Sequence, residues 1–259
     1  MSTAGIALLF IGVAFVTTLA CLEAGRLAGR RAFALPEASR PAGLGTVEGV
    51  AFGLLGLLLA FTFTGAATRF DARRAQVVEE ANDIGTAWLR LDLLPKEAQP
   101  KLREDFRRYA DSRIATYGRL AAADGAGARA EYERSLAIQN EIWAGAVAAT
   151  REGGSPAPML LLPALNAMID ITTTRRSSTE LHPPLIIYAV LALVSLGCAL
   201  LVGYEMGASE ARSWLHVMGY ALVVAFILYV IVDFEYPRLG LIRMEAFDRY
   251  LVDVRNAMK

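Results

Sequence analysis

The stretch "LLLAFTFTGAATRFDARR", Leu57 to Arg74, begins as an apolar segment and ends as a charged one. Residues 61–68 contain three threonines and two phenylalanines, and arginines follow with no proline between. Farther on, apolar residues recur at alternating spacings of four and three, which indicates one face of a helix. These residues are Val77, Ala81, Ile84, Trp88 and Leu91. We therefore predict that a membrane-spanning helix continues without a break into a polar helix.

The composition indicates a membrane protein with a polar domain. Of the 259 residues, 55% are hydrophobic and 20% are charged, so the two kinds occupy separate blocks. Four runs of about 19 to 20 residues without Asp, Glu, Lys or Arg have the length that crosses a bilayer as a helix. They lie at roughly 4–22, 49–68, 185–204 and 214–232.

The first run has a second interpretation, a cleaved signal peptide. "MSTAG" lacks a basic region and "TLAC" is a poor lipoprotein cleavage box, so we interpret the run as a span. Cys21 and Cys198 lie at or inside predicted spans, where neither a disulfide framework nor a CxxC metal site is expected. The net charge of zero supplies no basic stripe, so we expect no nucleic-acid partner.

Three further helical segments are predicted after the polar helix. Pro95 and Pro100, "AAADGAGA" and "GGSPAP" separate them, and the last helix contains Pro163, where we expect a kink. The fold is therefore predicted to be an all-α membrane protein with four transmembrane helices and a helical soluble domain between the second and the third. The predicted segments are a first transmembrane helix at 1–25, an exposed connector at 26–44, a second transmembrane helix and candidate pore helix at 45–68, the helical soluble domain at 69–182, a third transmembrane helix at 183–206, a short loop at 207–213, a fourth transmembrane helix at 214–233 and a C-terminal tail at 234–259.

Motifs for catalysis and cofactor binding are missing from the sequence. It contains no GxGxxG, P-loop, GxSxG or HExxH, and its two histidines lie at span ends. We therefore expect no enzymatic activity and no cofactor. Glu79, Glu80 and Asp83 share the polar side of their helix, and a solvated face or ion pairs to another helix explain them better than a metal site does.

The second span contains an unusual stripe. Gly45, Gly49 and Gly53 repeat every four residues, a spacing that lets another helix approach closely. A stripe narrower than roughly 90° continues along the helix. It consists of Gly53, Leu57, Phe61, Thr64 and Thr68. Two interpretations stay open: a packing face whose threonine hydroxyls bond to the carbonyl four residues earlier, or a pore lining in which an apolar constriction gives way to hydroxyls.

Arg69 and Arg73 have no carboxylate three or four residues away on their own helix. Both project more than about 100° from the centre of the stripe. Contacts with lipid headgroups or with another helix therefore explain them better than a role as pore-lining charges does.

Several blocks of the sequence, in order, resemble the bacterial bestrophin-like domain family of membrane proteins. The blocks are "LLAFTFTGAATRFDARRAQVVEEANDIGTAWLRLDLLP", "ALNAMIDITTTRR", "HPPLIIYAVLALVSLGCALLVGY" and "DFEYPRLGLIR". The resemblance extends from about Glu48 to Arg243. More distantly, the chain is similar to true bestrophins, which are oligomeric anion channels, pentameric in the known cases.

In bestrophins the second membrane helix lines a narrow neck and ends in Thr-Arg followed by aromatic residues. Thr68, Arg69 and Phe70 resemble that ending, and the resemblance places the three neck positions at Gly53, Leu57 and Phe61. Two departures are visible: Gly53 has no side chain and Asp71 replaces a second aromatic residue. The acidic cluster of a bestrophin calcium clasp is not recognisable, so the resemblance implies no metal site.

The resemblance implies a homo-oligomeric channel, a pentamer if it follows bestrophins, that is permeable to chloride or other anions and sits among lipids of the bacterial inner membrane. The stripe of Gly53, Leu57, Phe61, Thr64 and Thr68 is the expected pore lining. Arg69 and Arg73 are expected at the pore exit or on lipid headgroups. The alternative is a non-conducting membrane scaffold or sensor whose helical domain binds a protein partner.

Overall fold

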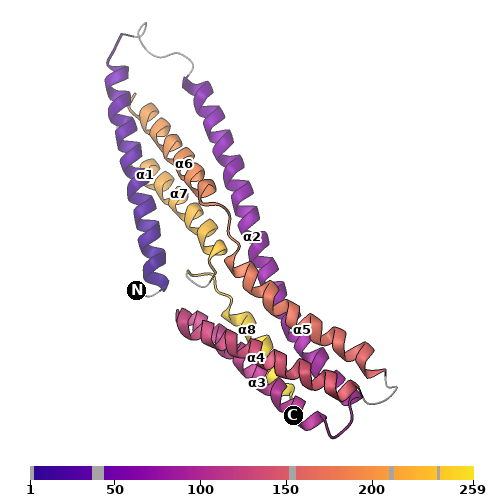
Figure 1. Cartoon of the computed structure of the whole chain (residues 1–259). Coiled ribbons are helices and arrows are strands. Elements are labelled where there is room, and N and C mark those ends of the chain that lie inside the picture. The colour runs from indigo at the N-terminus through magenta and orange to yellow at the C-terminus, as the bar shows by residue number, and fades with distance from the viewer. Residues whose placement is uncertain (1–2, 37–43, 152–155, 210–212, 238–239) are drawn as a thin grey trace. The chain divides into compact units, whose positions relative to one another are not determined.

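The computed structural model describes residues 3–36, 44–151, 156–209, 213–237 and 240–259. Within these ranges the regular structure is entirely helical, which confirms the all-α prediction. The elements are α1 (Thr3–Phe33), α2 (Leu44–Arg90), the short 3-10 helix η2 (Leu91–Leu93), α3 (Gln99–Ala121), α4 (Gly125–Thr150), α5 (Ala157–Glu180), α6 (Leu185–Met206), α7 (Trp214–Glu235) and α8 (Glu245–Ala257) (Figure 1).

The chain forms two compact units. The first unit comprises Met1–Phe70 and His182–Ile242, and the second comprises Asp71–Leu181 and Arg243–Lys259. The helix α2 contributes its first part to one unit and its last part to the other, because it runs from Leu44 to Arg90 without interruption. The predicted continuation of the second span into a polar helix is therefore confirmed.

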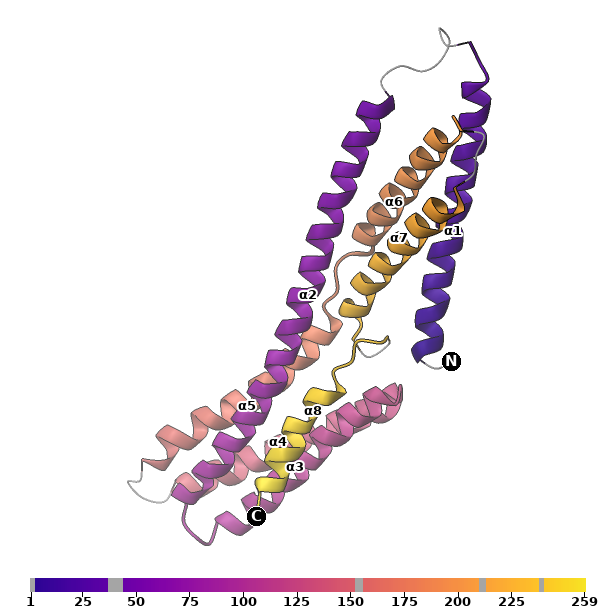
Figure 2. The ribbon, with the colours of Figure 1, turned by 180° about the vertical axis from the view of Figure 1, so that it is seen from behind.

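Four helical segments among the described residues are long and apolar enough to cross a membrane, as predicted from the charge-free runs. They are Gly5–Phe33, Gly45–Leu93, Ala157–Met206 and Trp214–Glu235. In the first unit, α1 packs along α6 and α7, which both views of the ribbon show (Figures 1 and 2).

Glycines bring α1 and α6 into backbone contact. A Cβ atom on Gly25 would collide with the carbonyl oxygen of Leu200, and one on Gly203 would collide with that of Leu22. Such close approach increases dispersion contact between membrane helices. The glycine repeat of α2 was expected to allow such a close approach. Within the described chain it does not, because a Cβ atom added at any of its three positions would meet nothing within 4 Å. These positions are Gly45, Gly49 and Gly53.

The connector expected at 26–44 begins later than predicted. Residues 26–33 are the last turns of α1, and Arg26 is buried. The physical reason is the close contact between α1 and α6. Gly29 lies against the backbone of Tyr204, so the additional turns of α1 bury surface of both helices that an exposed connector would leave uncovered. Residues 37–43 of the predicted connector lie outside the described part of the chain.

The second unit consists of the last part of α2 together with η2, α3, α4, α5 and α8. The predicted apolar stripe of α2 from Val77 to Leu91 is buried, and most of it belongs to the core of this unit. The "AAADGAGA" break is shorter than expected, because Asp124 accepts a 2.9 Å hydrogen bond from the Gly127 amide and caps α4 at its first turn. The helix α5 continues through Pro163.

The segment expected as a C-terminal tail contains a helix of the second unit. Leu251 and Met258 of this segment are buried in the core of that unit. The side chain of Arg255 in α8 donates a 2.7 Å hydrogen bond from Nε to Asp111 of α3. Residues 245–257 are therefore part of the helical unit, because their apolar face is covered by it.

Filling the glycine contact should destabilise the first unit. We expect Gly203→Ala to lower the free energy of unfolding by about 1–3 kcal/mol, since the new methyl group meets backbone that cannot turn away. Gly197→Ala on the same helix is the matched control, because nothing lies within 4 Å of that position. It should leave stability unchanged or raise it by up to about 1 kcal/mol through helix propensity. Thermal unfolding in detergent measures both, and equal melting temperatures would contradict the packing.

Candidate functional site

The helix α2 has two different faces within the first unit. Leu55 and Ala66 are buried on one face, in a cluster with Leu191, Cys198 and Ile231. At about 100° per residue, the opposite face of α2 is the predicted stripe. One side of the helix is therefore attached to its own chain, and the other side is directed away from it.

All five residues of the predicted stripe are exposed: Gly53, Leu57, Phe61, Thr64 and Thr68. The exposed fraction of Leu57 is 52% and that of Phe61 is 68%. The described part of the chain thus does not bury the stripe.

The hydroxyl of Thr68 donates a 2.8 Å hydrogen bond to the carbonyl oxygen of Thr64. This is the back-bonding that a packing face predicts, and it leaves the oxygen lone pairs of Thr68 facing outward. Because a hydroxyl rotates easily, the same geometry also suits a wet surface. The bond alone therefore does not separate the two interpretations of the stripe.

Phe61 borders a cavity of about 360 Å³ in the first unit. The cavity lies between α2, the segment before α6 and the start of α6, with one residue from α7. Its lining is Leu58, Phe61, Thr62, Gly65, Arg69, Pro183, Ile187, Tyr188 and Ile231. Most of these lining residues are apolar.

Arg69 forms an ion pair with α7, at the end of the stripe. Its Nε and Nη2 atoms donate to Glu235 Oε2 at 2.8 and 2.7 Å. Glu235 is fully buried, and its other oxygen lies 3.0 Å from His182 Nδ1. The ring of His182 stacks on Tyr236 at 4.4 Å between centroids. Arg69 therefore has the inter-helix partner that its own helix lacks.

Arg73 is buried in the second unit. Its Nε donates to the carbonyl oxygen of Ser178 at 2.9 Å, and its Nη2 to that of Leu181 at 3.4 Å. These carbonyls lie at the C-terminal end of α5, where backbone acceptors have no partner within the helix. Arg73 thus caps α5, which is a contact with another helix, one of the two expected explanations, and not a contact with lipid headgroups.

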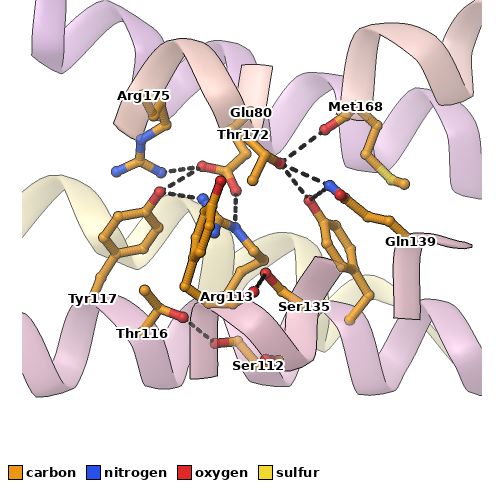
Figure 3. Close-up of polar contacts among 12 residues, drawn as sticks. Glu80, Ser112, Arg113, Thr116, Tyr117, Ser135, Gln139, Met168, Thr172 and Arg175 are labelled. Carbon is orange, nitrogen blue, oxygen red and sulfur yellow. Dashed lines mark hydrogen bonds and ion pairs between the residues drawn. The ribbon is translucent and has the colours of Figure 1, made fainter. Parts of the chain in front are cut away.

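A second polar cluster lies inside the second unit and is centred on Glu80 (Figure 3). Glu80 is fully buried and accepts a 2.6 Å hydrogen bond from Nε of Arg113. Arg175 also pairs with this carboxylate, and the hydroxyl of Tyr117 donates to it at 3.2 Å. The expected ion pairs to another helix are confirmed for Glu80, since these partners come from α3 and α5.

A neutral network adjoins the Glu80 cluster. Nε2 of Gln139 donates to the hydroxyl of Thr172 at 2.9 Å (Figure 3). It also donates to the hydroxyl of Tyr109 at 3.0 Å, and the two hydroxyls are 2.9 Å apart. Burial raises the pKa of Tyr109 to about 12, so its hydroxyl keeps its proton at neutral pH. The network links α3, α4 and α5 through buried hydrogen bonds.

Sequence reasoning placed Glu80 on a polar face and missed its burial. The signal was present in the spacing, because Glu80 lies three residues after Val77 and four before Ile84, both in the buried stripe.

Burial by itself lowers the pKa of Arg113, but the charge of Glu80 outweighs that effect and raises the pKa overall. Arg113 is therefore a permanent buried cation.

The described residues include no group of three or more His, Cys, Asp or Glu side chains arranged to hold a metal ion. Both oxygens of Glu80 already bond to arginine or tyrosine donors. Its neighbour Glu79 is exposed.

Comparison with known proteins gives one result. A family model described as "Bestrophin-like domain" matches residues 12–246. No match was found among curated proteins or among solved structures. The matched range includes the whole of α2 and extends into the start of α8.

Removing the charge of Glu80 should make the second unit less stable against unfolding. In Glu80→Gln the two arginines lose their buried counter-charge, and we expect a loss of about 3–5 kcal/mol in the free energy of unfolding. Glu79→Gln, one residue away and exposed, should change it by no more than about 0.5 kcal/mol. Urea unfolding followed by circular dichroism compares the two variants, and equal midpoints would show that the cluster does not contribute to stability.

Proposed function

Because the chain belongs to the bestrophin-like domain family, we propose that it forms a homo-oligomeric ion channel, permeable to chloride or other anions, rather than an enzyme. It is an integral membrane protein with four apolar helices. The observation that carries the proposal is the exposed stripe of α2, which lies opposite the face that attaches this helix to its own chain.

The stripe is poorly suited to lipid. Gly53 offers little dispersion contact, and the hydroxyls of Thr64 and Thr68 favour protein or water over hydrocarbon. When several copies of α2 surround one axis, the stripe faces that axis. Leu57 and Phe61 then narrow the conduit, and the threonines line a wet section beyond them.

Arg69 has a positioning role in this proposal. Its charge is compensated by the buried carboxylate of Glu235, so it contributes little net field to a passing ion. The ion pair instead holds the end of the stripe to α7. The preference for anions rests on family membership and on a stripe without any carboxylate.

The second unit is proposed to lie outside the bilayer as a soluble helical domain of a bacterial inner-membrane protein. Its surface carries ion pairs such as Arg108–Glu141 at 3.0 Å and Arg255–Asp111 at 2.7 Å. Charged side chains of this kind are costly in hydrocarbon and ordinary in water.

A second candidate function is a non-conducting scaffold or sensor, and the hydrogen bond from Thr68 to Thr64 is compatible with it. In that case the stripe packs against another copy without enclosing water, and the helical unit binds a protein partner. The two functions make different predictions for Phe61.

The proposal requires self-association. We expect the protein in mild detergent to have a mass several times that of the chain, because the stripe needs a partner or water. Mass photometry or light scattering tests this, and a particle of only 28.0 kDa would contradict the proposal.

Truncating Phe61 should widen the narrowest part of the conduit. An apolar constriction blocks ions because water leaves it and an ion must shed its hydration there. We therefore expect Phe61→Ala to raise chloride flux into liposomes while the oligomer stays assembled. Unchanged flux with a lower melting temperature would instead favour the scaffold.

Phe63→Ala is the matched control, two residues along the same helix. Phe63 packs edge-on against Phe234 with 5.6 Å between centroids, away from the stripe. Losing this pair should cost about 0.5–1.5 kcal/mol of stability. Its chloride flux should equal that of the unmodified protein, and a rise matching that of Phe61→Ala would remove the residue-level basis for the pore.

A further inference from the structure

A cavity of about 360 Å³ lies inside the second unit, between α3, α4 and α5. Its wall contains four arginines and two tyrosines from these three helices. They are Arg113, Tyr117, Arg129, Tyr132, Arg175 and Arg176. The volume is sufficient for a small metabolite.

The wall of this cavity is strongly basic. Glu180 is the one carboxylate among its described lining residues, and it already pairs with Arg176 at 3.1 Å. Glu80, behind the wall, pairs with both Arg113 and Arg175, and Asp248 lies 3.7 Å from Arg175 as a second carboxylate partner. The four arginines of the wall are therefore matched by three carboxylates, Glu80, Asp248 and Glu180. Positive charge therefore exceeds negative charge in a partly enclosed, low-dielectric space, which focuses the field on an anion.

Three of the four guanidinium groups, those of Arg113, Arg175 and Arg176, lie over aromatic rings. Arg175 lies over the ring of Tyr117 at 3.8 Å from its centroid, and Arg176 lies over that of Tyr132 at 4.8 Å. Stacking of this kind reduces the entropy lost when a guanidinium binds a ligand. The cavity is thus organised before a ligand arrives.

Two arginines retain unused hydrogen-bonding capacity. The side chain of Arg113 is 1% exposed, yet its Nη1 atom has no hydrogen-bond partner in the described chain. An unpaired buried donor is costly unless something satisfies it. Arg129 is exposed at the cavity and forms no ion pair with any described residue.

We propose that this cavity binds a small molecule carrying a phosphate group. A phosphate matches the surplus of positive charge, and its oxygens accept paired hydrogen bonds from guanidinium groups. The rings of Tyr117 and Tyr132 supply an apolar wall for the rest of the molecule. This site is independent of the proposed conduit, because every lining residue belongs to the second unit.

Calorimetric titration of the full chain in detergent with phenyl phosphate tests the proposal. We expect saturable binding, and no binding of phenol, which has the ring without the charge. Arg129→Gln should weaken binding about tenfold or more, since a charge-assisted hydrogen bond is lost.

Arg134→Gln is the matched control, with the same change of charge on the same helix. Arg134 lies outside the cavity, and its carboxylate neighbour is Glu131 at 3.6 Å. It should alter binding by less than about twofold, because an exposed charge outside the site is screened. Equal weakening in both variants would show a non-specific charge effect and overturn the site.

Two further ligands identify the chemistry. Succinate tests a dicarboxylate, and binding tighter than that of phenyl phosphate overturns the assignment to phosphate. Dihexanoylphosphatidic acid tests a lipid as the source of the phosphate, and preference for it over phenyl phosphate supports the site with a lipid headgroup as occupant. If neither phenyl phosphate nor dihexanoylphosphatidic acid binds, the proposal is overturned.

Discussion

The helix α2 has to satisfy two environments with one uninterrupted backbone. Its first part buries Leu55 and Ala66 among apolar neighbours, and its last part buries Ile84 and Leu91 in the core of the helical unit. No proline or turn separates the two parts, because α2 runs without interruption from Leu44 to Arg90. The outward direction of the stripe follows from the first part alone, where Leu55 and Ala66 are buried on the opposite face.

Buried carboxylates fix the partners of α2 in each unit. Glu235 holds Arg69 in the first unit, and Glu80 holds Arg113 and Arg175 in the second. Removing a carboxylate from water is costly, and pairing with a cation offsets that cost rather than adding much net stability. These pairs therefore select one arrangement of helices, because any other arrangement leaves a buried charge uncompensated.

Two features of this architecture, the stripe of α2 and the basic cavity, lead to different proposed functions. The stripe of α2 is left uncovered because its opposite face is already occupied, and a conduit between copies is the proposed way to cover it. The basic cavity arises where the four arginines of its wall outnumber their carboxylate partners, Glu80, Asp248 and Glu180. One proposal concerns association of the chain with itself, and the other concerns recognition of a phosphate group.

Local spacing was enough to predict the helices up to α7, the four apolar spans, the unbroken passage across Thr68 and Arg69, and the stripe. The helix α8 was missed, because its segment was expected to be a tail. Helix formation and membrane crossing depend on neighbours three or four residues apart and on segment length, and both are visible in a single sequence. The same logic explains why the burial of Glu80 was missed: its spacing fits the buried stripe, but its charge indicated solvent.

Contacts between distant segments needed the folded chain. Gly25 and Gly203 make the close approach that spacing alone predicts for the glycines of α2, and Arg69 finds its carboxylate 166 residues away. Whether the glycines of α1 and α6 or those of α2 make a close helix contact depends on which helix faces pack together. That packing depends on how all the helices bury their apolar surface. Local periodicity describes each face but contains no information on its partner.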